Sequence, residues 1–179
     1  ASILSLLFIF VYILLRFRRW QFSIGAIAAL FHDVVIVLGI FSLFKGIMPF
    51  SMEIDQAFIA AILTIIGYSI NDTVIVFDRI RETATNNPNG NIKWIVNKAI
   101  QNTLSRTSIT SLTTFFVVFI LFLFGGDGIR GFAFALLIGI IVGTYSSMFI
   151  ASPVVVDTTS DAGSLKYTEH EDDDPVLAG

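Results

Sequence analysis

Residues 67–82 read GYSINDTVIVFDRIRE and place the carboxylate of Asp72 inside an otherwise apolar segment that is long enough to cross a bilayer. An ionisable group inside hydrocarbon costs about 2.5–3.5 kcal/mol on insertion scales. A chain that keeps such a group usually uses it. The segment therefore predicts an ion or proton site within a membrane helix.

The composition is that of a membrane protein. Of the 179 residues, 55% are hydrophobic and 14% are charged, whereas soluble domains average about 25% charged residues. Two histidines and no cysteine give no metal-ligand pattern. We find no phosphate-binding loop or soluble-enzyme motif. We therefore expect no enzyme activity, no metal, no cofactor and no nucleic-acid partner, and any work to be driven by a gradient or a partner.

Hydropathy predicts an all-α, polytopic bundle of transmembrane helices. We expect the spans to be helices because, in lipid, the backbone N–H and C=O groups of each segment must hydrogen-bond to one another. Arginine and lysine are concentrated in the links after the first and third spans. By the positive-inside rule, those links and the C-terminus are cytoplasmic and the start of the chain lies outside. The five expected spans are residues 1–15, 22–44, 57–78, 107–124 and 132–156.

The regions outside the spans carry their own signals. After a turn signal at residues 86–90, apolar residues recur with helical spacing and predict an amphipathic helix over about residues 91–104. Two placements remain open, in the membrane interface or packed on a cytoplasmic partner. Residues 157–179 are acidic and poor in apolar residues, which predicts a disordered tail. The chain begins within an apolar run, so we expect an upstream part of a longer protein.

Three ionisable groups fall within or at the ends of the spans. Asp33 is central in the second span, and Asp72 lies six residues before the end of the third, about 9 Å deep at 1.5 Å per residue. Arg106 precedes the fourth span at the cytoplasmic boundary. We interpret the three as a proton relay. The alternative is a static Asp72–Arg106 ion pair that only locks two helices together.

Polar neighbours of these groups are candidates for supporting the relay. Hydroxyls spaced along one helix face can hold a water chain, although they can equally bond their own backbone. The histidine before Asp33 is either its relay partner or a packing residue. The candidates are Asn71, Ser69, Thr110, Thr113 and His32.

The last span carries small residues at every fourth position, a pattern that lets helix backbones approach closely in lipid. We interpret these residues as packing positions in a tight bundle or against a partner subunit. They are Ala135, Gly139, Gly143, Ser147 and Ala151.

Four segments carry a family resemblance: FHD at 31–33, residues 67–82, NTLSRT at 102–107, and residues 124–156. They resemble the SecF family of bacterial protein-export membrane subunits, or the second half of a fused SecDF chain. The resemblance covers residues 1–156. It implies five spans of a six-helix half of a resistance-nodulation-division transporter, with a first helix and an outer-face domain preceding this chain.

The resemblance also implies a function. In this family, proton flow through the membrane domain is coupled to late-stage translocation of preproteins on the outer face of the bacterial inner membrane. The implied partners are SecD, separate or fused, the SecYEG channel, YajC and YidC, exported preproteins and membrane lipid. Asp72 and Arg106 fall at the family's proton-path positions, with Asp33 as a third member. The alternatives are a proton-driven small-molecule exporter of the same superfamily and a structural membrane subunit.

Overall fold

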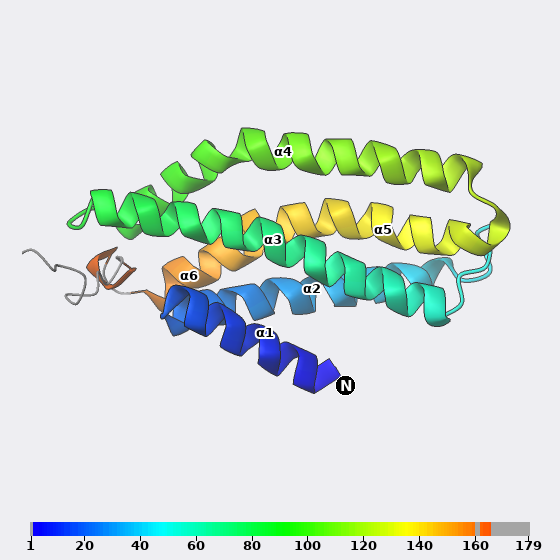
Figure 1. The fold of residues 1–179 in the computed structure, drawn as a ribbon, viewed down its shortest axis with the longest axis horizontal. Helices are drawn as coiled ribbons and strands as arrows, with labels where there is room; N and C mark the ends of the chain where they lie inside the picture. Colours follow the sequence, from blue (N-terminus) through cyan, green and yellow to red (C-terminus); the bar gives the residue numbers. More distant parts are fainter. Residues whose placement is uncertain (1, 160–161, 166–179) are drawn as a thin grey trace, which may run out of the picture.

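Every element in the described part of the chain, residues 2–159 and 162–165 of the computed structural model, is a helix, which confirms the all-α prediction. The long helices lie side by side, with their axes nearly along the long axis of the molecule, while α1 slants away from the bundle (Figure 1). The elements are α1 (Ser2–Phe17), α2 (Trp20–Phe44), α3 (Gln56–Asn86), α4 (Ile92–Phe124), α5 (Asp127–Ser146), the π-helix η1 (Ser147–Ala151), α6 (Ser152–Thr158) and the 3-10 helix η2 (Ala162–Leu165).

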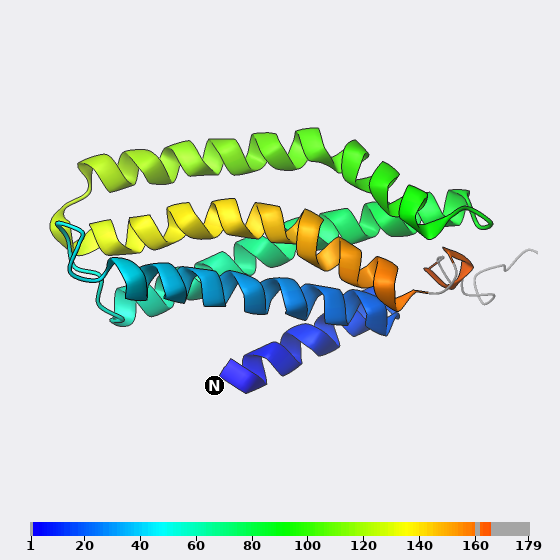
Figure 2. The same ribbon diagram turned by 180° about the vertical axis from the view of Figure 1, so that it is seen from behind.

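The helices have the dimensions of a multi-pass membrane protein. By length and composition, α2, α3, α4 and the continuous run Asp127–Thr158 are each able to cross a bilayer, and α1 has a shorter apolar stretch, Phe8–Phe17. Figure 2 shows α5 and α6 running between α4 and α2. The connections α1–α2 and α3–α4 lie together at one end of the molecule (Figure 1), which we call the basic end because most of the arginines and lysines gather there.

Two helix boundaries differ from those expected. The helix expected over 91–104 and the span expected over 107–124 form one helix, α4, because no glycine or proline interrupts residues 92–124. Helix α3 continues past residue 78 to Asn86 for the same reason. Within the expected tail, residues 157–158 complete α6, and η2 buries Leu165 completely. Residues 160–161 and 166–179 of that tail lie outside the described residues.

Two apolar clusters make up the core, one toward each end of the bundle. Near the basic end, Phe17, Phe22 and Phe77 are buried with ring centroids 4.9–5.8 Å apart. Toward the opposite end, Phe41 and Phe58 pack with centroids 4.4 Å apart. Between the clusters, α2, α3, α5 and η1 carry buried polar side chains that we call the polar layer: Asp33, Ser69, Asp72, Thr73, Ser146 and Ser147.

Candidate functional site

Small residues on α5 and η1 bring the helices of the polar layer close together. A Cβ added to Gly139 would overlap the side chain of Ile65 on α3, and one added to Gly143 would lie 3.1 Å from the Cβ of Ser69. Ala135, Ser147 and Ala151 on the same face are also buried. This close approach allows short serine side chains to reach across between helices.

Asp33 is fully buried and receives hydrogen bonds from two other helices. The hydroxyl of Ser69 on α3 donates to its Oδ2 at 2.6 Å, and that of Ser146 on α5 donates to the same oxygen at 2.9 Å. Nδ1 of His32 lies 3.2 Å from Oδ1, and the His32 side chain remains 30% exposed. Asp33 is therefore held firmly at the junction of α2, α3 and α5.

Asp72 has a different environment, although it lies only one helical turn from Ser69. The residue is 2% exposed, and its Oδ2 is buried with no hydrogen-bond partner among the described residues. The hydroxyls of Ser111 and Thr144 and the guanidinium of Arg106 lie near its carboxyl group, but none of them is hydrogen-bonded to Oδ2. A buried polar atom without a partner is costly and calls for a physical reason. Asp72 is thus the less constrained of the two carboxyl groups.

The hydroxyls beside Asp72 bond one another across helices. Ser111 Oγ on α4 lies 2.7 Å from Thr144 Oγ1 on α5, and the Tyr68 hydroxyl donates to Ser111 Oγ at 3.2 Å. At the next residue of α3 after Asp72, Thr73 Oγ1 lies 2.9 Å from Ser147 Oγ. These contacts tie α3, α4, α5 and η1 together at the level of the polar layer.

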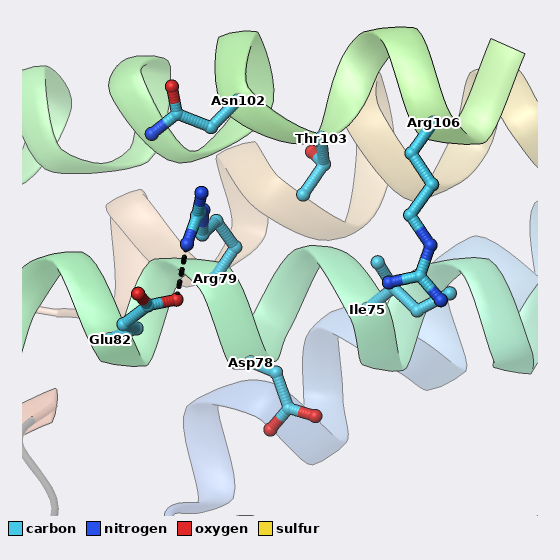
Figure 3. Close-up of a pocket in the computed structure, with 7 residues that line it drawn as sticks. All are labelled: Ile75, Asp78, Arg79, Glu82, Asn102, Thr103 and Arg106. Atoms are coloured by element: carbon cyan, nitrogen blue, oxygen red, sulfur yellow. Dashed lines mark hydrogen bonds and ion pairs between the residues drawn. The ribbon is translucent and has the colours of Figure 1, made fainter.

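Arg106 lies at the inner margin of a cavity of about 300 Å³ between α3 and α4, on the side of the basic end. Figure 3 shows its side chain reaching from α4 toward Ile75 on α3, while Asp78 points away from it. The ion pairs found in the described part of the chain do not include Asp72 with Arg106. The cavity is lined by Ile75, Asp78, Arg79, Glu82, Asn102, Thr103 and Arg106.

The carboxylates that line this cavity are paired with arginines other than Arg106. Arg79 Nη1 lies 2.6 Å from Glu82 Oε2, the contact drawn in Figure 3. Asp78 Oδ2 lies 3.0 Å from Arg16 Nη2 and joins α3 to α1. The Arg106 guanidinium is therefore held near Asp72 by its position on α4 and not by a salt bridge to the cavity's carboxylates.

The other predicted support residues lie apart from the polar layer. Thr110 and Thr113 are on the exposed face of α4, where their hydroxyls donate to backbone carbonyls of the preceding turn. Asn71 is also exposed, on the side of α3 away from Asp33 and its serines. Of the five support residues, the structure brings only Ser69 and His32 into contact with a predicted relay carboxylate.

Sequence reasoning missed the buried hydroxyls of α4 and the α5 threonine that bonds one of them. Thr107 and Ser111 are 1% and 8% exposed, and Thr144 bonds Ser111. With Thr103, the two α4 residues recur at every fourth position, and this spacing is visible in the sequence. A second hydroxyl stripe through Thr110 has similar spacing, so periodicity alone could not choose between them.

Comparison with known proteins identifies the family. Residues 1–161 match the family model described as "Protein export membrane protein SecD/SecF, C-terminal". The chain belongs to the SecD/SecF C-terminal family. Among members of this family, the protein translocase subunit SecF of Rhodothermus marinus is 60% identical over 162 residues, which cover 90% of this chain and 52% of that protein.

Fused and solved members of the SecD/SecF family also match. The protein translocase subunit SecDF of Brucella abortus is 49% identical over 156 residues, covering 87% of this chain and 20% of that protein. A crystal structure of SecDF in its super-membrane-facing form superposes with a TM-score of 0.77 at 44% identity, over 87% of this chain and 20% of the other. The chain thus spans about half the length of the SecF relatives.

Proposed function

We propose that this chain is the SecF portion of a Sec protein-export translocase in the bacterial inner membrane. It couples proton flow through the membrane domain to late-stage translocation of preproteins on the outer face. Support comes from family membership and from relatives named as translocase subunits SecF and SecDF. SecD, separate or fused, is the expected partner, together with the SecYEG channel, YajC and YidC.

The observation that carries this proposal is the unpartnered Oδ2 of Asp72 in the middle of a membrane helix. Such a group is expensive to keep in a membrane and is a functional site by default. Asp33 has two serine donors and is held in place, whereas Asp72 Oδ2 has no partner among the described residues and lies near Ser111, Thr144 and Arg106. A proton that crosses the full membrane field releases about 2.3 kcal/mol per 100 mV. Asp72 is the group best suited to bind and release that proton.

The proposed orientation follows from the loop charges. The basic end has Arg16, Arg18 and Arg19 at the α1–α2 connection and Arg79 and Arg81 in the last turns of α3, and it faces the cytoplasm by the positive-inside rule. The cavity that Arg106 lines then opens on the cytoplasmic side, and Asp72 lies deeper in the membrane. Protons driven inward leave Asp72 toward this cavity.

The outward face of α4 supports a membrane-embedded partner. It carries a continuous set of exposed apolar side chains, and the threonines on it satisfy their hydroxyls internally. That chemistry suits contact with SecD helices or lipid, because neither supplies hydrogen bonds along the whole face. The exposed apolar residues are Ile109, Leu112, Phe116, Val117 and Ile120.

The decisive experiment is Asp72→Asn in the complete translocase reconstituted into vesicles, with proton flux, preprotein export and subunit abundance measured separately. We expect proton-driven export to be lost while the complex still assembles. The control is Asp127→Asn, the same chemical change on a side chain that is 87% exposed, and it should leave all three quantities unchanged. Normal export with Asp72 neutralised would refute the proposal. Loss of SecD association instead would favour the purely structural subunit.

A further inference from the structure

The buried face of α4 carries a ladder of hydroxyls that leads from the cavity to Asp72. Thr103 lines the cavity, and Ser111, eight residues on, adjoins Asp72. Thr107 lies midway between them on the same helix face, because residues four apart are neighbours along a helix. It is 1% exposed, so its side chain is enclosed by the bundle.

The three hydroxyls differ in their hydrogen bonds. Thr103 Oγ1 donates to the carbonyls of Ala99 and Ile100 at 3.0 and 3.1 Å. Ser111 Oγ pairs with Thr144 Oγ1 at 2.7 Å. Thr107 Oγ1, in contrast, is buried without a partner among the described residues. Threonine in a helix normally bonds a carbonyl of the preceding turn, as Thr103 does, so Thr107 departs from the local pattern.

Between Thr73 and Asp78, α3 carries only apolar side chains. Ile75 lies one turn from Asp72 and forms the apolar part of the cavity lining. In Figure 3 the Arg106 side chain extends from α4 toward Ile75. The polar side chains between Asp72 and the cavity are therefore on α4: Thr107, which is buried, and Arg106, which lines the cavity.

We propose that the Thr107 hydroxyl carries protons between Asp72 and the cytoplasmic cavity, a step that rests on the proton-coupled function proposed above. Because the two side chains are not hydrogen-bonded to each other, the proton released from the Asp72 carboxyl reaches the Thr107 oxygen through one intervening water molecule, and the O–H proton of Thr107 passes to water in the cavity. Rotation of the hydroxyl then restores the starting arrangement. One proton is transferred, Asp72 becomes a carboxylate, and no bond other than O–H forms or breaks.

Three variants in the complete translocase test the step, each measured as proton flux per assembled complex in vesicles. Thr107→Val keeps the shape of the side chain and removes the hydroxyl, and we expect flux to fall about tenfold or more. Thr107→Ser retains the hydroxyl and should restore most of the flux. Thr64→Val makes the same change on α3, outside the ladder, where the hydroxyl donates to the backbone carbonyl of Ala60 at 2.8 Å, and it should leave flux unchanged.

Stability separates a relay from a merely structural role. Because the Thr107 hydroxyl has no partner, its removal should leave the complex as stable as before or more stable. Unaltered flux in Thr107→Val, or flux that falls only in proportion to stability, would overturn the inference. If Asp72→Asn abolishes flux and Thr107→Val does not, only this step fails. If Asp72→Asn leaves flux intact, the proposed function itself fails.

Discussion

Replacing Gly139 by alanine tests the close approach of α5 to α3. The new methyl group would overlap Cγ1 and Cδ1 of Ile65 and lie 2.9 Å from its Cγ2. Ile65 is 2% exposed, and its γ atoms are fixed near the backbone, so it cannot swing clear. Overpacking of this kind costs about 1–3 kcal/mol. Relative to a glycine-to-alanine change that meets no neighbouring atom, the equilibrium constant for unfolding should rise about 5- to 150-fold.

The matched control is Gly39→Ala on α2, where an added Cβ meets no atom within 4 Å. Alanine improves helix propensity by about 0.8–1.0 kcal/mol at either position, so the difference between the two variants isolates the steric contribution. Denaturant titration of the purified protein in detergent, followed by helical circular dichroism, measures both. In a double-mutant cycle, Gly139→Ala should cost less in an Ile65→Ala background than beside the full Ile65 side chain. Equal effects at Gly139 and Gly39, within about 0.5 kcal/mol, would refute the predicted clash.

Two further predictions concern polar contacts and use the same titration. Ser69→Ala removes the 2.6 Å hydrogen bond to buried Asp33 and should cost about 1–3 kcal/mol, whereas Ser105→Ala on the exposed face of α4 should cost almost nothing; equal costs would contradict the assigned role of Ser69. The Arg16–Asp78 pair has side chains 39% and 38% exposed, so a double-mutant cycle should give a coupling energy below about 1 kcal/mol. A larger coupling would mean that this pair is shielded from solvent in the complete complex.

Much of the bundle could be predicted because its signals are local. A run of about 20 apolar residues indicates a span wherever it occurs, and α2, α3 and α4 lie where hydropathy predicted spans. The boundaries were less well predicted. The end of an apolar run marks where the lipid-compatible segment stops, but it does not stop the helix. Helix α4 continues through Arg106 because no residue there breaks helical hydrogen bonding.

The candidate site was only partly predictable. Asp72 and Asp33 stand out in the sequence because a carboxylate in an apolar run is rare. Their different surroundings could not be anticipated, since Asp33 meets Ser69 across 36 residues and Ser146 across 113. Which carboxyl group is satisfied and which is not depends on contacts between helices.

The sequence alone determined the helical, membrane-spanning character of the chain, the presence of Asp72 within a span, and the resemblance to the SecF family. These depend on the composition and order of neighbouring residues. Tertiary structure decided that α4 turns Thr107 and Ser111 inward and leaves Thr110 and Thr113 on the exposed face. The reason is rotational: two hydroxyl stripes with the same helical period are equivalent in isolation, and only packing against α3 and α5 distinguishes them.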